Sequence, residues 1–417
     1  MITLDKNSYK GTRDFYPEDL RVRKYIFAKW SEMLESFGFD EYATPLLEPL
    51  NIFAAKSGEE IVNEQTYSFE DRGGRRLAIR PEMTPSVSRL IAARRQELAY
   101  PARLYSIANF MRYERAQRGR EREFWQVNAD VFGDDSIYAD AEIVYLADKS
   151  LRKFGADKSM FEIRINDRHL IDFIMKEYLG LDDGKTRSLM KLLDKINKIS
   201  DADFNRQAEI IFGQATGSIL PRVRSLVDAK TLDMIPQKVQ DSAEFKRVLD
   251  LFVLLEELGV ETAIFDITLM RGLDYYTGVV FEVFDLDKNN NRSMFGGGRY
   301  DGLVGLFGVE PIGAVGFAVG YTTTELFLQN HKLLPKFKNE TDIYIALVDQ
   351  NCFKAAFELA EKLRGEGRPI ELDSRDVKLD KKFKTAEKKG IGKMIIFGET
   401  EAKSGEYEIK ELSKSKP

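Results

Sequence analysis

The chain has 417 residues, enough for two or three domains, and a formal net charge of −5 at pH 7. This balance excludes a polycation wrapped around nucleic acid, so any basic surface is local. The single cysteine, Cys352, excludes internal disulfides and thiolate zinc sites, which favours a reducing compartment such as the cytoplasm. No apolar stretch approaches the roughly 18 residues of a membrane span, so the sequence predicts neither export nor insertion into a membrane.

Histidine is scarce, with only His169 and His331 in the whole chain. This excludes metal sites built from clustered histidines and argues against a serine or cysteine nucleophile activated by histidine. Any chemistry therefore rests on Arg, Asp, Glu and Tyr. These side chains suit the stabilisation of negative charge on phosphate, because arginine offers a fixed fork of donors.

In chain order, the first predicted element is an amphipathic helix over residues 17–37, which ends before Gly38. A strand with prolines follows. Residues 67–83 alternate in polarity around a glycine pair, which predicts a hairpin of an antiparallel sheet. Residues 102–115 and 122–133 predict two more strands that flank an arginine-rich turn.

The pattern of predicted secondary structure then changes three times along the chain. Helix formers with Lys and Asp predict a helical insertion, after which strand patterns return in AIFDITLMRGLDYYTGVVFEVFDL and GGGRYDGLV. The last segment alternates as βαβαβ and predicts a small, mostly parallel sheet. The predicted division is a catalytic domain in two parts, 1–165 and 251–330, an insertion at 166–250, a linker at 331–340 and a terminal domain at 341–417.

The densest cationic segment, residues 112–122, holds five arginines against two glutamates. A solvated hairpin tip is the simple interpretation, since charge runs are commonly just surface. However, Phe124 and Trp125 begin the return strand, and an aromatic ring beside arginines can stack a base while the arginines hold phosphates.

A second candidate is RGLDYYTG at 271–278, where Arg271 stands near Asp274 and two tyrosines. A structural ion pair with Asp274 and a cleft that reaches an anionic ligand explain this pattern about equally well, because a buried charge needs a partner. In RPEMT, Glu82 follows a strand and could receive a substrate ammonium group, although a surface glutamate is the more common meaning.

Two further segments have simple interpretations beside functional ones. The glycine-rich run at 296–308 matches neither a P-loop nor a strand-to-helix GxGxxG motif, so a tight turn is favoured over a nucleotide loop. Seven lysines against two acids between Lys378 and Lys393 predict either a solvated helix face or a patch that contacts phosphates.

Together these segments resemble histidyl-tRNA synthetase, a class II aminoacyl-tRNA synthetase, over essentially the whole chain. FGFDEYATPLLEP is similar to class II motif 1, the helix-strand unit of the dimer interface, and FMRYERAQRGREREFWQVNADVFG is similar to motif 2. LMRGLDYYTGVVFEV resembles a signature of the histidine enzyme, and RGLDYY is its most specific part. The resemblance implies an α+β fold: an antiparallel sheet flanked by helices, a helical insertion and a C-terminal α/β anticodon-binding domain.

The resemblance also implies roles for individual residues. Arg112 and Arg271 would be catalytic and grip the α-phosphate of ATP from opposite sides. The implied histidine-binding residues are Glu82, Met83, Thr84, Gln126, Asp130, Arg271, Tyr275 and Tyr276; the implied ATP-binding residues are Arg112, Arg120, Phe124 and Arg299; the implied tRNA contacts are Arg115, Gln117, Lys381 and Lys382.

By the same resemblance the chain would be a cytoplasmic homodimer that uses ATP with transient Mg²⁺, L-histidine and tRNA(His), without a tightly bound metal. One departure concerns motif 3, where the strand AVGFAVG is followed by Tyr321, Thr322 and Thr323 instead of a segment with the usual arginine. Arg299 or a lysine could substitute. The departure is the best support for an alternative, a noncatalytic histidine-binding paralogue such as the regulatory subunit of ATP phosphoribosyltransferase. The intact RGLDYYTG, the arginine-rich motif 2 loop and the lysine-bearing terminal domain argue against this alternative. An adenylate-forming ligase for another acceptor is a third reading, against which the terminal domain argues.

Overall fold

The computed structural model describes residues 4–54, 64–270, 275–288, 290 and 293–412. It forms two compact units, Met1–Leu334 and Pro335–Pro417, and the boundary between them falls inside the predicted linker.

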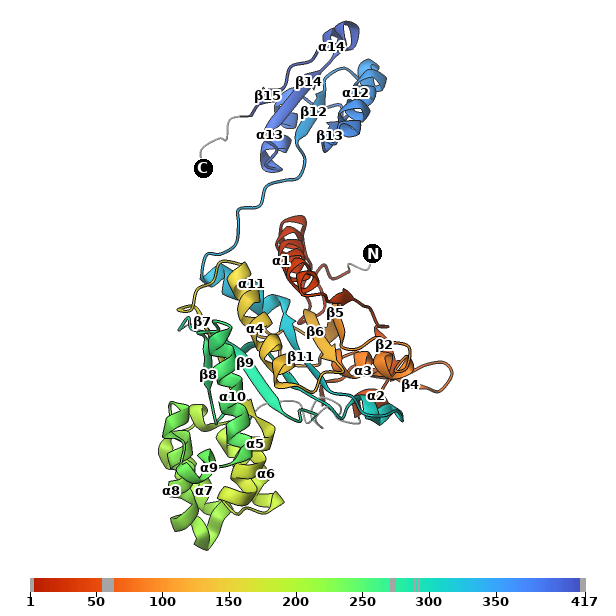
Figure 1. The fold of residues 1–417 in the computed structure, drawn as a ribbon. Helices are drawn as coiled ribbons and strands as arrows, with labels where there is room; N and C mark the ends of the chain where they lie inside the picture. The colour runs from red at the N-terminus through yellow and green to blue at the C-terminus, as the bar shows by residue number, and fades with distance from the viewer. Residues whose placement is uncertain (1–3, 55–63, 271–274, 289, 291–292, 413–417) are drawn as a thin grey trace. The chain divides into compact units, whose positions relative to one another are not determined.

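The first unit combines helices with two sheets (Figure 1). Its helices are α1 (Pro17–Ser36), α2 (Asn51–Ala54), α3 (Thr84–Ala93), α4 (Ile137–Lys153), α5 (Arg168–Phe173), α6 (Asp183–Leu193), α7 (Asp201–Phe212), α8 (Thr216–Val227), α9 (Gln237–Gln240), α10 (Ala243–Glu257) and α11 (Tyr321–Asn330), with short turns η2 (Ile174–Tyr178), η3 (Ile196–Lys198), η4 (Gly213–Ala215), η5 (Leu232–Met234) and η6 (Val304–Phe307). Its strands are β1 (Asp40–Glu41), β2 (Leu47–Pro49), β3 (Ser68–Glu70), β4 (Arg76–Ile79), β5 (Ala102–Met111), β6 (Glu123–Phe132), β7 (Phe161–Asp167), β8 (Ala263–Phe265), β9 (Val279–Asp285), β10 (Ser293–Arg299) and β11 (Ala314–Gly320).

Eight strands form the main sheet in the order β1-β5-β6-β11-β10-β9-β7-β8. The interior pairs are antiparallel, as predicted, whereas the outermost pairs at the two edges, β1–β5 and β7–β8, are parallel. The predicted α+β class is confirmed. The predicted glycine-turn hairpin is also present as β3–β4, but it belongs to a separate three-stranded sheet with β2.

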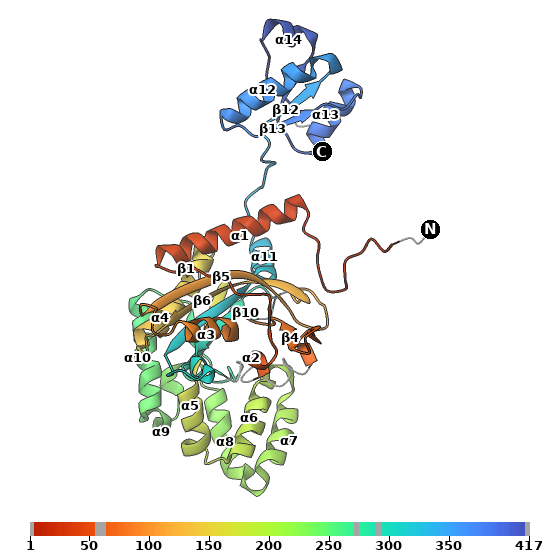
Figure 2. The same cartoon turned by 90° about the vertical axis from the view of Figure 1, so that its right-hand side faces the viewer.

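The main sheet packs helices on both faces. Trp30 of α1, Ile143 of α4 and Phe327 of α11 belong to the core cluster on one face, whereas Val87 and Ile91 of α3 belong to the cluster on the other. Figure 2 shows α1 and α3 on opposite sides of the sheet. We call the second side the α3 face.

The alternation of β5 and β6 decides which side chains reach each face. These strands pair over ten residues, from Ala102 opposite Phe132 to Met111 opposite Glu123. Val127, Ala129 and Val131 pack in the cluster of α1 and α4. Because successive strand residues point to opposite sides, the even-numbered residues of β6 face α3.

The predicted helical insertion is present as the helices from α5 to α10, which share their own core with Leu189, Phe204 and Val223 among its buried members. Side chains cap several of these helices; for example, Ser200 accepts from the backbone N–H of Asp203 and begins α7. Helix α10 continues to Glu257, past the predicted end of the insertion at 250.

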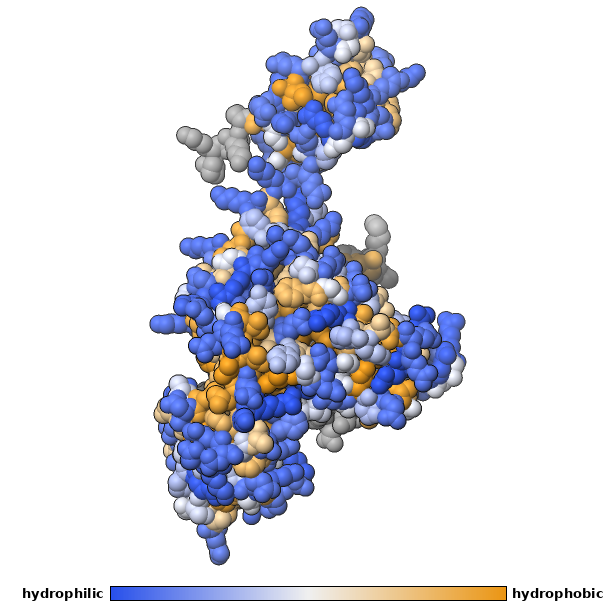
Figure 3. Space-filling view, viewed as in Figure 1, coloured by the Kyte–Doolittle hydropathy of each residue, from blue (hydrophilic) through white to orange (hydrophobic). Residues whose placement is uncertain are grey.

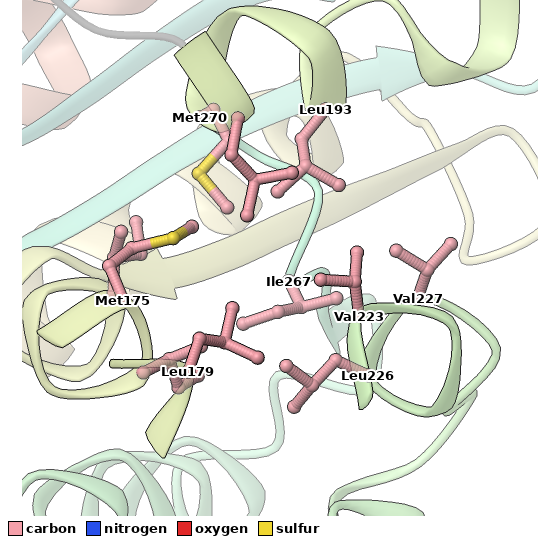
Figure 4. Close-up of a pocket in the computed structure, with 11 residues that line it drawn as sticks. Met175, Leu179, Leu193, Val223, Leu226, Val227, Ile267 and Met270 are labelled. Carbon is pink, nitrogen blue, oxygen red and sulfur yellow. The ribbon is translucent and has the colours of Figure 1, made fainter. Parts of the chain in front are cut away.

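The insertion encloses a small void (Figure 4), where Met175, Ile267 and Met270 meet side chains of α6 and α8. The cavity measures about 10 Å³ and its lining is apolar. A space of this size holds at most one water, and an apolar lining gives a water no partner. The void is therefore a packing defect of the helical core and not a ligand site.

The second unit contains strands that alternate with helices, as predicted. They are η7 (Gln350–Cys352), α12 (Phe353–Gly365), α13 (Leu379–Lys388), α14 (Glu399–Ser404), β12 (Ile343–Leu347), β13 (Ile370–Asp373), β14 (Lys393–Phe397) and β15 (Lys410–Glu411). The sheet order is β13-β12-β14-β15, with the first three strands parallel and β15 antiparallel at the edge.

The surface is mostly hydrophilic in the view of Figure 3, and apolar side chains gather beside α10 and β8. Leu249, Val253 and Ile264 are exposed there. Within the described ranges, no helix is both long and apolar enough to cross a bilayer.

Candidate active site

A strip of polar side chains crosses the middle of the α3 face. Gln126, Asn128 and Asp130 lie on β6 at successive even positions, between Phe124 and Phe132, which pack in the cluster of α3. Asn128 and Asp130 are 3% and 4% exposed. The sequence therefore places three hydrogen-bonding side chains in a row on one face of a central strand.

Glycines beside this strip make room for the side chains of Asp130 and Tyr276. Asp130 pairs with Gly316 of β11, and Gly316 pairs with Gly298 of β10. A Cβ atom at Gly316 would lie 2.1 Å from Oδ1 of Asp130, and one at Gly298 would lie 2.9 Å from the ring of Tyr276.

The tight turn predicted for the glycine-rich run is wrong at the start of the run, because Gly296, Gly297 and Gly298 belong to strand β10.

Asp130 is the buried acid of the site. The hydroxyl of Tyr300 donates to its Oδ1 at 2.5 Å. Burial raises the pKa of Asp130 to about 7, although the Tyr300 hydrogen bond acts in the opposite direction. A carboxyl group that titrates near neutral pH can accept a hydrogen bond from a ligand N–H once it is ionised.

A second acid, Glu82, lies between β4 and α3. It is 4% exposed, and the hydroxyl of Tyr275 donates to its Oε2 at 3.1 Å. The same hydroxyl lies 3.3 Å from Oγ1 of Thr84, the first residue of α3. Burial raises the pKa of Tyr275 well above its ordinary value, and the charge of Glu82 adds to this shift.

The three tyrosines connect Glu82 with Asp130. The ring centroids of Tyr275 and Tyr276 are 5.0 Å apart, and those of Tyr275 and Tyr300 are 5.8 Å apart. Glu82, Asp130, Tyr275 and Tyr276 are thus brought together as predicted from the sequence. Met83 is 1% exposed in the cluster of α3, where its sulfur accepts from the hydroxyl of Thr44.

Arg112 and Phe124 form a cationic and aromatic pair beside the polar strip. The guanidinium carbon of Arg112 lies 5.4 Å from the ring centroid of Phe124, and its Nε donates to the carbonyl of Pro81 at 2.9 Å. The Phe124 ring stacks on Phe110 with centroids 5.7 Å apart. This arrangement orients Arg112 next to a flat apolar ring, which suits a nucleotide base and its phosphates.

The loop between β5 and β6 carries the other predicted arginines. Arg115 and Gln117 are exposed, as a contact with a macromolecule requires. Arg120 is also exposed and donates to the carboxylate of Glu114, with its Nη2 at 2.7 Å from Oε1. In this arrangement the pair of Arg120 and Glu114 holds the loop.

Arg299 does not lie on the α3 face. It is 2% exposed, and its Nε donates to Oδ1 of Asp140 of α4 at 2.7 Å. Other nitrogens donate to Asp301 and to the carbonyls of Asp134 and Ser136. The predicted ATP contact conflicts with this geometry, because the odd position in β10 turns the side chain toward α4.

The start of α11 shows what stands in place of the motif 3 arginine. Thr322 donates to Oε2 of Glu121 at 2.9 Å, and Thr323 donates to the carbonyl of Met294 at 2.8 Å. Both hydroxyls thus tie α11 to neighbouring segments. Since Arg299 is engaged elsewhere, it does not compensate for the missing arginine in this arrangement.

The two predicted lysines of the second unit differ. Lys381 is exposed on α13, whereas Lys382 is 0% exposed and donates to the carbonyl of Asp373 at 2.8 Å. Burial lowers the pKa of Lys382. The buried ammonium group is unavailable to RNA, so the predicted tRNA contact of Lys382 conflicts with the structure.

The prediction for Arg271 falls outside the described residues, as does Asp274. Sequence reasoning missed Tyr300 and Asn128. The signal for Asn128 was available, because it stands midway between two candidates on a strand of period two. Tyr300 follows Arg299 and the three glycines before it, which carry no polarity pattern and so give no indication of a face.

Among the described residues, no group of three or more His, Cys, Asp or Glu side chains is placed to hold a metal ion. A divalent cation here would have to find most of its ligands on a substrate.

Comparisons with known proteins agree with this picture. The family model described as "Histidyl-tRNA synthetase" matches residues 11–323, and the one described as "Anticodon binding domain" matches residues 342–416. A histidine–tRNA ligase of Leptospira biflexa is 38% identical over 413 residues, which cover 98% of this chain and 94% of the relative.

Two solved structures share the fold. A histidyl-tRNA synthetase from Nostoc sp. PCC 7120 matches with a TM-score of 0.78 at 24% identity, over 98% of this chain and 97% of that chain. A structure described as an ATP phosphoribosyltransferase regulatory subunit/histidyl-tRNA synthetase from Bacillus halodurans C matches with a TM-score of 0.79 at 24% identity, over 95% of this chain and 100% of that chain.

Proposed function

Because the chain belongs to the histidyl-tRNA synthetase family, we propose that it is a histidine–tRNA ligase. It activates L-histidine with ATP to histidyl-adenylate and transfers the histidyl group to the 3′ end of tRNA(His). The observation that carries this proposal is the shared α3 face, on which Asp130, the Tyr275–Glu82 pair and the Arg112–Phe124 pair lie together.

In the first step, a carboxylate oxygen of histidine attacks the α-phosphorus of ATP in line. The new bond joins that oxygen to phosphorus, and the bond to the bridging oxygen breaks, so pyrophosphate leaves with the electron pair. Charge grows on the phosphoryl oxygens, and fixed cations stabilise it better than a general base would. Arg112 supplies one such cation while Phe124 stacks adenine, and Arg271 supplies a second.

Histidine itself is held through its α-ammonium group and its imidazole ring. The buried carboxylate of Glu82 receives the α-ammonium group, with the hydroxyl of Thr84 beside it. Asp130 accepts the imidazole N–H, while Gln126, Tyr275 and Tyr276 line the pocket. A site with buried polar groups rejects analogues that cannot pair with them, which gives selectivity for imidazole. The buried side chain of Met83 packs in the cluster of α3 and supports the pocket.

Mg²⁺ would be bound together with ATP. Magnesium in such sites is held by one or two carboxylates together with substrate phosphates, which fits a face that offers single acids instead of a cluster. Glu282 is opposite Gly296 on the α3 face and would supply one oxygen ligand. When bound, the ion neutralises charge on the phosphates of ATP.

In the second step, a ribose hydroxyl of the terminal tRNA nucleotide attacks the carbonyl carbon of the adenylate. The ester bond forms, the bond to the phosphate oxygen breaks, the hydroxyl proton passes to the leaving phosphate group, and AMP leaves. Arg115 and Gln117, exposed on the loop between β5 and β6, approach the acceptor end. Lys381 contacts backbone phosphates from the second unit, which supplies affinity without reading sequence.

The active form is a cytoplasmic homodimer. Its support in this chain is the exposure of Leu46 and Leu47, 42% and 43%, in the segment similar to motif 1, because a partner that covered them would remove apolar surface from water. Sedimentation analysis of the purified chain tests this: a monomer at micromolar concentration would contradict it.

Exchange of labelled pyrophosphate into ATP, run with histidine and with each other amino acid, tests the activity. Exchange that depends on histidine alone supports the ligase. The absence of exchange, together with histidine binding, would favour the regulatory paralogue instead, to which the threonines of α11 give the best support. Against that alternative stands the second unit, matched as an anticodon-binding domain.

Removal of residues 338–417 tests the division of labour. We expect tRNA charging to fall by about 100-fold or more, because one of two linked binding units is lost, while pyrophosphate exchange stays near the level of the full chain. Equal losses in both assays would contradict the proposed roles.

A further inference from the structure

Several buried polar atoms lack a hydrogen-bond partner among the described residues, and three of them lie around Asp130 on or beside the α3 face. They are the hydroxyl of Tyr42, Oγ of Ser106 and Nδ2 of Asn128. Ser106 and Asn128 are 1% and 3% exposed. Buried polar groups in native proteins are almost always paired, so an unpaired set beside a ligand site indicates that the ligand completes it.

The three groups lie close together around Asp130. Ser106 of β5 is directly opposite Asn128 of β6, and Asn128 is two positions before Asp130 on the same face. The backbone N–H of Tyr42 donates to the carbonyl of Tyr105 at 2.8 Å, which places Tyr42 beside Ser106. Burial raises the pKa of the Tyr42 hydroxyl well above its ordinary value; the charge of Asp130 adds to this shift and the nearby hydroxyl of Ser106 opposes it, so both side chains lie close to Tyr42.

Asp130 and Asn128 present complementary chemistry to a neutral imidazole ring. Such a ring has one N–H donor and one nitrogen that accepts. The ionised carboxylate of Asp130 can only accept, whereas Nδ2 of Asn128 can only donate. Side chains two positions apart on one strand face are separated by about 6.7 Å at their origins, a span that accommodates a five-membered ring between two hydrogen bonds.

We infer that Asn128 is a specificity-determining residue for histidine, an inference that rests on the proposed function. Its amide donates a hydrogen bond to the imidazole nitrogen that Asp130 does not take. Ser106 and Tyr42 act as positioning residues, whose hydroxyls orient the amide and the ring edge when the ligand is bound.

The test compares Asn128→Leu, which has nearly the same shape but no donor, with Thr262→Val as a matched control. Thr262 is also buried, but its hydroxyl donates to Asp148 at 2.6 Å on the opposite side of the sheet. Each full-length variant is assayed for its KM for histidine and for ATP in pyrophosphate exchange, for histidine binding by calorimetry and for Tm.

For Asn128→Leu we expect the histidine KM and Kd to rise about tenfold, the loss of one hydrogen bond, with the ATP KM within twofold and Tm unchanged or higher. Thr262→Val should lower Tm and leave the histidine KM unchanged. A lower Tm for Asn128→Leu with unchanged histidine affinity would overturn the inference, because Asn128 would then be merely structural.

Ring analogues sharpen the test. The two isomers of pyrrolylalanine keep a ring N–H and replace the second nitrogen by carbon. Wild type should prefer histidine to the isomer that still pairs with Asp130, and Asn128→Leu should lose most of that preference, whereas an unchanged preference would refute the role. Calorimetry distinguishes this from failure of the proposed function, since a regulator would bind histidine through Asn128 without exchange; wild type that binds no histidine would refute both.

Discussion

On the side of the main sheet that packs against α4, Arg299 has four hydrogen-bonded partners; on the α3 face, the amide nitrogen of Asn128 has none among the described residues. Both side chains are almost fully buried. The difference separates two uses of buried polar groups. The partners of Arg299 lie within the chain, so this group stabilises the fold, whereas the unpaired amide of Asn128 lies in the polar strip of the candidate site and is available to a ligand.

The largest expected effect comes from breaking the hydrogen bonds of Arg299. Arg299→Ala leaves Asp140 buried without its main partner, so we expect the free energy of unfolding to fall by about 3–5 kcal/mol. Chemical denaturation measures this loss. If stability were unchanged and the KM for ATP rose instead, Arg299 would be an ATP contact after all, and the comparison of the two faces would fail.

Arg112→Ala probes the ligand side. We expect kcat for pyrophosphate exchange to fall by about 100- to 1000-fold, the usual cost of removing one donor that stabilises transition-state charge. The free energy of unfolding should change little, since among the described residues the Arg112 guanidinium makes one hydrogen bond, from Nε to the carbonyl of Pro81. A large loss of stability with normal turnover would assign Arg112 to the fold.

Asp130→Asn tests the pH dependence of the ligand side. Because burial raises the pKa of Asp130 to about 7, the folded state keeps a proton that the unfolded state has released above about pH 4. The free energy of unfolding of wild type therefore falls as pH rises between about 4 and 7. The Asp130→Asn variant has no carboxyl group to titrate at this position, so its free energy of unfolding does not fall in this way.

At pH 8 we expect Asp130→Asn to be more stable than wild type by roughly 2–4 kcal/mol, and at pH 4 to be equal to it. Urea unfolding at both pH values measures the difference. Histidine affinity should fall in the same variant, because the acceptor for the ring N–H is weakened. A stability gain that did not depend on pH would show that Asp130 is ionised throughout.

The smallest effect is expected in the second unit, where the same contrast recurs between neighbouring lysines. Lys381→Ala should raise the KM for tRNA about threefold and reduce its salt dependence, as the loss of one phosphate contact does. Lys382→Ala should lower the Tm of the unit instead, because Asp373 loses a buried partner. Equal effects of both variants on the tRNA KM would contradict this assignment.

Regular patterns made much of the fold predictable from sequence. A periodic pattern of apolar residues shows directly which face of an element is buried. Such patterns occur in β5 and β6, in α1 and in the alternating strands and helices of the second unit. The three consecutive glycines in β10 give no such pattern, so the sequence did not predict which face of the sheet Arg299 points to.

The candidate site was predictable to the extent that its residues stand in distinctive motifs. Glu82, Asp130 and the tyrosine pair come from segments distant in sequence that the fold brings together. Lys382 misled because a charged residue was taken as exposed, although it stands on the same side of α13 as the buried Ala386. Its ammonium group finds a carbonyl that only the folded chain supplies.

The glycines of β10 have a consequence for how this gene can vary. An added Cβ would meet the carbonyl of Phe281 at Gly296, that of Gly316 at Gly297 and that of Val279 at Gly298, all within 2.5 Å. Every amino-acid replacement reachable from a glycine codon by one base change introduces such a carbon. A mutational scan should therefore find three adjacent codons in which only synonymous changes survive, whichever side of the strand each residue faces.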